Sequence, residues 1–368
     1  RKKGSRNYLL YPKRVSYIQY KEAKRLPVFN MSKYRGGFHE QSFNQRKKPF
    51  GSLAMRTLGD MYSDVTLGAK NGLELQYDSI LRGQEGITHR QKVRNQWLNI
   101  VDIPPVDGCD IITTIDVGMQ DIAEKALLDQ LKEIGGNVGV AILMEVKTGA
   151  IRAIANMKKM GNGYDESYNY AIGDATEPGS VFKLMTLVSL LEDGHVTLED
   201  PIDGSGGKWS YGGHTYSDTH DYGLMDVKLA LAKSSNVAFA KLAVAYYEGK
   251  EQQYVDRLNS MKVGERFNLD IQGEARAAIY GPGDAMWSRS SLSSMAIGYS
   301  TLLTPLHTLT FYNAIANDGK MMKPYFIENY QENGEIVKNF GPQEISGSIC
   351  SKETAREARR ALRHVVEV

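Results

Sequence analysis

The sequence predicts a mixed α/β (α+β) fold, in which a layered sheet-and-helix domain follows a less regular N-terminal part. Two observations favour this class over a helical bundle. Apolar runs on both sides of a turn predict a hairpin over residues 138–155, and helical spacing of apolar residues recurs between residues 119 and 316. The composition, 42% hydrophobic and 24% charged, excludes wholesale disorder, collagen and a multi-span membrane protein. A length of 368 residues suits two domains, or one large domain with an attachment.

Positive charge is concentrated at the N-terminal end. Residues 1–50 hold 14 Lys and Arg against 2 Asp and Glu, a charge of +12, so the remaining 318 residues carry −10. The stretch can be the solvated face of a small domain, or it can attract an anionic membrane surface or an acidic partner. Nucleic-acid binding is not expected, because no recognisable nucleic-acid module accompanies the charge.

The best domain boundary lies between residues 107 and 108. Pro104 and Pro105 favour extended backbone there and end any preceding helix. Ahead of the boundary, apolar-polar alternation over Val15–Ile18 suggests strands, and glycines between residues 68 and 86 indicate loops and short elements.

The hydrophobic pattern sharpens after the boundary. It predicts a strand over 110–115, a helix over 119–134 capped by Asp116, and a hairpin with strands at 138–144 and 150–155. A Gly-, Ser- and Asp-rich stretch at 203–223 predicts a loop. Further helices are predicted over residues 180–191, 227–247 and 305–316, the last with Pro305 in its first turn and Gly319 beyond its end.

The two cysteines, Cys109 and Cys350, lie far apart in the sequence and form no C-x-x-C or Cys/His cluster. A zinc site and a disulfide scaffold are therefore not expected, and the cysteines leave the redox compartment open.

The strongest local feature is Ser180 followed by Lys183 at the start of an apolar helix. Residues at i and i+3 share a helical face, so the amine can act as a base toward the hydroxyl if burial lowers its pKa toward neutrality. The helix N-terminus adds N–H groups where an oxyanion would form. Taken alone, the pair also fits a helix cap with a surface lysine. Ser205 and Lys208 repeat the spacing, but the two glycines between them favour a loop.

A second polar cluster, Ser234-Ser235-Asn236, follows Ser180 by 54 residues. A hydroxyl at Ser234 can relay protons, and the amide of Asn236 can donate and accept hydrogen bonds to a peptide substrate. A helix cap and a turn would use the same residue types. The Ser-x-Asn pattern also occurs at residues 42–44 and 167–169, but both of those copies precede Ser180.

In this order, Ser-x-x-Lys followed by Ser-x-Asn, the sequence resembles penicillin-binding proteins and serine β-lactamases. Pro178–Lys183 looks like the nucleophile segment of class B, monofunctional transpeptidases. Similar stretches lie at residues 114–120, 298–299, 304–306 and 316–319, and residues 72–77 followed by 81–83 resemble the N-terminal pedestal of that family. The resemblance covers about residues 70–368. Its nearest branch is the FtsI-like enzymes of cell division, with the elongation branch left open.

The resemblance implies a penicillin-binding transpeptidase fold, an antiparallel sheet with helices on both faces, over residues 108–368. It also implies an irregular, β-rich pedestal domain of the dimerisation type over residues 1–107. The family carries a third motif, Lys-Thr-Gly or Lys-Ser-Gly, downstream of Ser-x-Asn. Lys147-Thr148-Gly149 precedes Ser180 and is interpreted as a hairpin turn, so we expect the third motif shortly beyond Val368. His307, where the family often carries Gln, is expected to be structural.

The resemblance further implies acyl transfer on peptidoglycan without a metal or organic cofactor. Ser180 would attack the D-Ala-D-Ala bond of a stem peptide, with Lys183 as its general base. Ser234 would pass a proton to the leaving group, and Asn236 would orient the donor peptide. β-Lactams would acylate Ser180.

Partners and location also follow from the resemblance. We expect peptidoglycan stem peptides, β-lactam antibiotics, and a glycosyltransferase with other cell-division membrane proteins as partners. The parent protein would be held in the cytoplasmic membrane by an N-terminal helix absent from this chain, with its catalytic domain in the periplasm. Two alternatives stay open: a catalytically incomplete scaffold of the division machinery, and a β-lactamase or β-lactam sensor.

Overall fold

The structure is a computed structural model that describes residues 9–11, 13, 15–31, 33–40, 47–63, 67–93 and 96–368. It divides into two units, residues 1–51 and 52–368. The first unit contains the helices α1 (Tyr17–Ala23) and α2 (Lys33–Gly36). The boundary predicted at residues 107 and 108 stays a prediction, although Leu73 and Tyr77 pack into a core cluster of the second unit with Ile151 and Ile154.

The strand suggested over Val15–Ile18 is wrong, because a helix starts there. Ser16 is the N-cap of α1: its Oγ accepts from the backbone N–H of Gln19 at 3.3 Å, while its own N–H donates to Gln19 Oε1 at 2.9 Å. This reciprocal capping box outweighs the short apolar-polar alternation.

The second unit opens with short elements, as the glycines between residues 68 and 86 indicated, and then forms a two-stranded antiparallel ribbon. These elements are α3 (Met55–Leu58), α4 (Gly72–Gln76), α5 (Asp78–Arg82), β1 (Ile87–Val93) and β2 (Gln96–Ile103).

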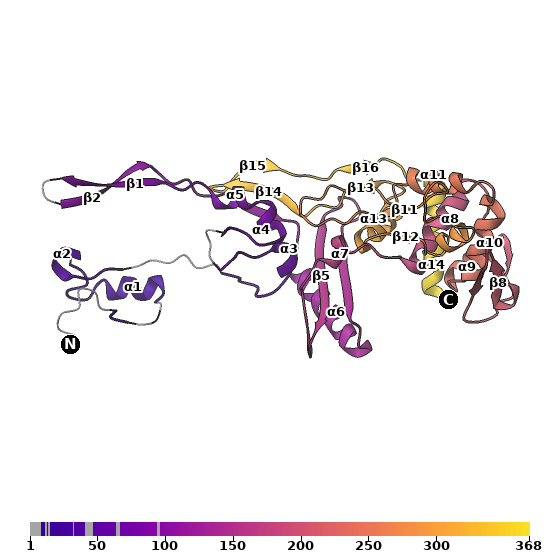
Figure 1. The fold of residues 1–368 in the computed structure, drawn as a ribbon, viewed down its shortest axis with the longest axis horizontal. Coiled ribbons are helices and arrows are strands. Elements are labelled where there is room, and N and C mark those ends of the chain that lie inside the picture. The colour runs from indigo at the N-terminus through magenta and orange to yellow at the C-terminus, as the bar shows by residue number, and fades with distance from the viewer. Residues whose placement is uncertain are drawn as a thin grey trace. The chain divides into compact units, whose positions relative to one another are not determined.

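The central sheet has the antiparallel order β4-β5-β6, formed by Val138–Met144, Ile151–Met160 and Gly163–Asp165. The predicted hairpin is confirmed, with Lys147-Thr148-Gly149 in its turn. The predicted helix is also confirmed as α6 (Val117–Ile134), whose N-cap Asp116 accepts from Met119 N at 2.9 Å. Figure 1 shows α6 running alongside β5.

Helices cover both faces of this sheet. A side chain at Gly139 would meet Leu127 and Leu131 of α6, whereas Val140 and Ile142 line a groove with residues of α13 (Pro305–Ala316). Because successive strand residues point to opposite faces, α6 and α13 lie on opposite sides of β4. The expected architecture is therefore present in the structure.

The remaining strands form small antiparallel groups. The predicted strand over 110–115 is β3 (Asp110–Thr113), which pairs with β14 (Ile327–Glu332), itself paired with β15 (Glu335–Asn339). The other pairs are β7 (Pro201–Asp203) with β10 (Leu224–Asp226), β8 (Lys208–Tyr211) with β9 (His214–Ser217), β11 (Ala278–Ile279) with β12 (Thr301–Leu302), and β13 (Met321–Met322) with β16 (Glu344–Ser346).

The loop predicted over 203–223 is partly wrong, because β8 and β9 form a hairpin inside it. Gly212 and Gly213, at φ +59° and +84°, make its two-residue turn, where both residues need positive φ. The strands carry polar residues such as Ser210 and Thr215, whose hydroxyls bond to each other at 2.8 Å, so the sequence shows no hydrophobic pattern that predicts strands here.

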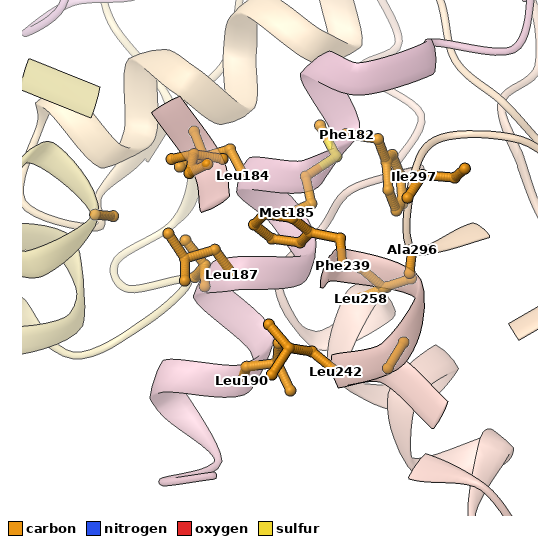
Figure 2. Packing of buried hydrophobic residues seen from close by; sticks show 14 of the residues in the cluster. Phe182, Leu184, Met185, Leu187, Leu190, Phe239, Leu242, Leu258, Ala296 and Ile297 are labelled. Carbon is orange, nitrogen blue, oxygen red and sulfur yellow. The ribbon is translucent and has the colours of Figure 1, made fainter. Parts of the chain in front are cut away.

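The main core surrounds α8 (Lys183–Glu192), whose residues 183–190 are all buried. Figure 2 shows Met185 beside Phe239 and Leu190 beside Leu242 of α10 (Asn236–Tyr247), whereas Leu184 and Leu187 project from the other side of α8. The other helices of this unit are α7 (Tyr170–Gly173), α9 (Val227–Ala232), α10 (Asn236–Tyr247), α11 (Glu251–Ser260), α12 (Ser291–Met295) and α14 (Lys352–Glu367). Across the described residues, no helix combines the length and apolar character needed to cross a membrane.

Candidate active site

The first half of the site is the turn that leads into α8. Gly179, at φ +64°, begins a 3₁₀ turn over Gly179–Phe182, and the α-helix starts only at Lys183. Ser180 is exposed in this turn, whereas the Lys183 side chain is buried. Lys183 Nζ lies 3.0 Å from Ser180 Oγ, so the two residues share a face as their spacing predicts.

The second half is a break between α9 and α10. The single helix predicted over 227–247 is wrong, because Ser234 adopts a left-handed conformation at φ +52°. Ser235 then caps α10, with its Oγ accepting from Ala238 N at 3.0 Å. The cap starts a new helix, and the break leaves Ser234 exposed beside the first half of the site.

Lys183 joins the two halves through four contacts. Its Nζ donates to two carbonyl oxygens, Ser234 O and Asn236 Oδ1, each at 2.7 Å. It also lies 3.0 Å from two hydroxyls, Ser180 Oγ and Ser234 Oγ. Carbonyl oxygens only accept, so a neutral amine uses two protons on them and keeps its lone pair for a hydroxyl.

Burial lowers the pKa of the Lys183 amine to about 8, and the nearby Asp218 carboxylate partly opposes this shift. Desolvation disfavours the charged ammonium, so an appreciable fraction of the amine is neutral near physiological pH. A buried amine with a lowered pKa, next to an exposed hydroxyl, is a suitable general base.

Asp218 is a residue of the site that the sequence did not reveal. It directly follows β9 and accepts three hydrogen bonds from the start of α10: from Asn236 N at 2.6 Å, Val237 N at 3.1 Å and Ser235 Oγ at 2.5 Å. The Asn236 amide also donates to Ser217 O at 3.1 Å. The carboxylate thus fixes the loop by satisfying N–H groups that a helix start leaves open.

Replacing Asp218 with Ala is expected to lower the free energy of unfolding by about 2 kcal/mol, because hydrogen bonds to a charged acceptor are lost together. It should also slow acylation of Ser180 about tenfold, since a misplaced Asn236 weakens the alignment of the site. Urea unfolding and β-lactam acylation kinetics measure the two effects. Asp221→Ala, which removes one exposed contact to Gly223 N in the same loop, is the matched control. Equal effects of the two variants would contradict this assignment.

An apolar groove of about 510 Å³ borders the segment ahead of Ser180. Its walls come from β4, from the residues around Pro178 and from α13 with Leu303 ahead of it. In the central sheet, among the strands that the structure describes, β4 pairs only with β5 and so presents an open edge.

Three other patterns in the sequence lie outside this cluster. Lys147-Thr148-Gly149 lies in the β4–β5 turn, and Ser205 Oγ accepts from Lys241 Nζ at 2.8 Å. His307 is buried, stacks on Phe267 and has Thr304 Oγ1 within 2.7 Å of its Nδ1, which is a structural setting. Within the residues that the structure covers, no group of three His, Cys, Asp or Glu side chains is placed to hold a metal ion.

Comparison with known proteins identifies relatives of the chain. Residues 139–368 match the family described as "Penicillin binding protein transpeptidase domain". The penicillin-binding protein PbpB of Mycolicibacterium smegmatis is 30% identical over 88% of this chain and 50% of its own length. The probable peptidoglycan D,D-transpeptidase PenA of Neisseria meningitidis is 27% identical over 88% of this chain and 54% of its own. The chain thus spans about half the length of the curated relatives it matches.

Among solved structures, penicillin binding protein 3 of Mycobacterium tuberculosis, complexed with aztreonam, superposes with a TM-score of 0.73 at 26% identity. The match covers 88% of this chain and 69% of the mycobacterial chain, and the match to the unliganded form of that protein has the same coverage. The similarity extends beyond residues 139–368 into the N-terminal part of the chain.

Proposed function

The chain belongs to the penicillin-binding protein transpeptidase family, and on that premise we propose that it carries the catalytic part of a peptidoglycan D,D-transpeptidase. The observation that supports this most is the position of Lys183 Nζ, buried and within 3.0 Å of both Ser180 Oγ and Ser234 Oγ. One amine so placed can take a proton from one hydroxyl and deliver it through the other.

In the proposed acylation, Ser180 Oγ attacks the carbonyl carbon between the two terminal D-alanines of a stem peptide. The hydroxyl proton moves to the neutral Nζ of Lys183, and a C–O bond forms. As the C–N bond breaks, a proton passes from Lys183 through Ser234 Oγ to the departing D-alanine amine. Ser180 N–H, at the start of the helix, is one donor to the oxyanion. We assign the second donor to the strand that carries the family's third motif.

In the proposed second step, an amine from a neighbouring stem peptide attacks the ester carbonyl. It loses a proton to the relay, the C–O bond breaks and Ser180 regains its hydrogen. Asn236 is assigned to orient the donor peptide, because its amide is held between Lys183 Nζ and Ser217 O. The chemistry of these residues calls for no metal or organic cofactor.

The proposal extends to inhibitor, location and partners. A β-lactam would acylate Ser180 as a mimic of the donor, in line with the aztreonam-bound relative. By the resemblance to FtsI-like enzymes, we place the reaction in septal wall synthesis on the periplasmic side of the cytoplasmic membrane. A glycosyltransferase and other cell-division membrane proteins are the proposed partners.

Labelling of the full-length protein with fluorescent penicillin tests this function. We expect one covalent adduct, mapped by mass spectrometry to the peptide that contains Ser180, and persisting for many minutes. Sustained hydrolysis of a chromogenic cephalosporin would favour a β-lactamase instead, and absence of any adduct would favour a scaffold.

A further inference from the structure

One short segment contacts both halves of the candidate site. It consists of α12 and the turn that follows it, residues 291–300, and is called the bridging segment below. It adds nothing to the contacts of Lys183 itself, so the proposed chemistry leaves its role open. Its hydrogen bonds to the two halves are made through the backbone of Gly298 and Ser300 and through two hydroxyls, those of Ser293 and Ser294.

Toward the nucleophile, the bridging segment contacts the backbone that precedes Ser180. Gly179 N donates to Gly298 O at 3.0 Å, and Ser300 N donates to Glu177 Oε1 at 2.9 Å. Gly298 has φ +87°, and a Cβ there would lie 1.9 Å from Gly179 O. Since no side chain fits at that distance, the two backbones can approach this closely only with glycine.

Toward the Ser-Ser-Asn loop, the bridging segment contacts Tyr216 of β9. The Tyr216 hydroxyl is buried and lies 2.7 Å from Ser293 Oγ and 3.0 Å from Ser294 Oγ. The next two residues along the chain are Ser217, which ends β9, and Asp218; they bond to the side chain and the backbone of Asn236, respectively. A chain of contacts therefore runs from the bridging segment to the loop that carries Ser234.

We propose that the bridging segment sets the distance between Ser180 and the Ser-Ser-Asn loop, with Tyr216 and Gly298 as positioning residues at its two ends. The inference rests on the proposed function, because it concerns the geometry of the same acylation. The two halves of the site are 54 residues apart in sequence, and Lys183 bonds to both only while they keep their spacing. Tyr216 connects the bridging segment to the Ser-Ser-Asn loop, and Gly298 connects it to the backbone that precedes Ser180.

Loss of the Tyr216 hydroxyl should free β9 from α12 and let the loop move away from Lys183. Water would then reach the amine, whose burial is the main cause of its lowered pKa. The groups facing Nζ are the hydroxyls of Ser180 and Ser234, two carbonyl oxygens, and the more distant Asp218 carboxylate. With hydration, the pKa of Lys183 rises, and acylation requires a higher pH.

The test compares Tyr216→Phe with Tyr211→Phe in the full-length protein. Each variant removes one hydroxyl from the same hairpin, but Tyr211 bonds to Glu248 rather than to the bridging segment. Penicillin acylation rates are measured from pH 6 to pH 10, with thermal unfolding in parallel. For Tyr216→Phe we expect about a tenfold lower rate at neutral pH and a rate profile displaced to higher pH. Tyr211→Phe should match the wild type in both.

A wild-type rate and profile in Tyr216→Phe would overturn the inference, as would a lower rate with an unshifted profile. The double variant Ser293→Ala with Ser294→Ala, which removes both partner hydroxyls, should reproduce the displaced profile and provides the test if Tyr216→Phe does not fold. A wild-type protein that penicillin does not acylate at all would instead contradict the proposed function. The two failures are therefore distinguishable.

Discussion

Replacing Ser180 with Ala is expected to abolish covalent labelling by fluorescent penicillin. Among the residues that the structure describes, Ser234 is the only other one with an exposed hydroxyl in contact with Lys183, and it belongs to a separate loop after α9. The Ser180 side chain is exposed, so the variant should keep the fold and unfold at nearly the wild-type temperature. In-gel fluorescence after incubation with the antibiotic gives the result directly.

Ser205→Ala is the matched control, because Ser205 belongs to the other Ser-x-x-Lys pattern of the chain. Its hydroxyl accepts from Lys241 and lies near Asp203, outside the proposed site. This variant should label as fully as the wild type. If Ser180→Ala retained full labelling, the nucleophile would be another residue and the proposed mechanism would fail.

How far the sequence predicts this structure depends on how local each interaction is. The helix at 117–134 and the hairpin at 138–160 follow from caps, periodicity and a turn glycine, all of which lie within a few residues of one another. The sequence did not predict the β8–β9 hairpin, because its stabilising residues are polar or aromatic and its turn glycines are also typical of a loop. The sequence did not predict the helix break at Ser234, because an Ala- and Leu-rich pattern continues on both sides of it.

In the candidate site, too, the sequence predicts contacts between neighbouring residues but not contacts between distant ones. Ser180 and Lys183 could be paired from the sequence because three residues along a helix fix their relative position. Asp218, Tyr216 and Gly298 could not, since each acts on a segment that is distant in sequence. Folding alone brings these residues to the site. Neither residue type nor spacing distinguishes Asp218 and Tyr216 from ordinary polar and aromatic residues, and the family-like stretch that contains Gly298 gave no indication of its contact with Gly179.

Replacing Lys183 with Met is expected to reduce the rate of Ser180 acylation about a thousandfold, because general-base assistance contributes roughly 10²–10⁴. Met retains most of the length and apolar stem of the side chain but removes the amine that contacts both hydroxyls. Stopped-flow acylation kinetics measure the loss. Lys241→Met removes a lysine whose contacts are to Asp203 and Ser205, and it should leave the rate unchanged.

The pH dependence separates a base from a merely structural lysine. With a pKa of about 8, the wild-type acylation rate should rise about tenfold for each pH unit below 8 and level off above it. The free energy of unfolding also depends on the titration of Lys183. Between pH 8 and the ordinary lysine pKa of 10.5, this amine binds more protons in the unfolded chain than in the folded one. This amine therefore adds stability as pH rises through that window, and Lys183→Met should lack both the rate limb and this increment in urea unfolding. A wild-type acylation rate that stays constant between pH 6 and pH 9 would show that Lys183 is not the base, because the rate would then not depend on the fraction of the amine that is neutral.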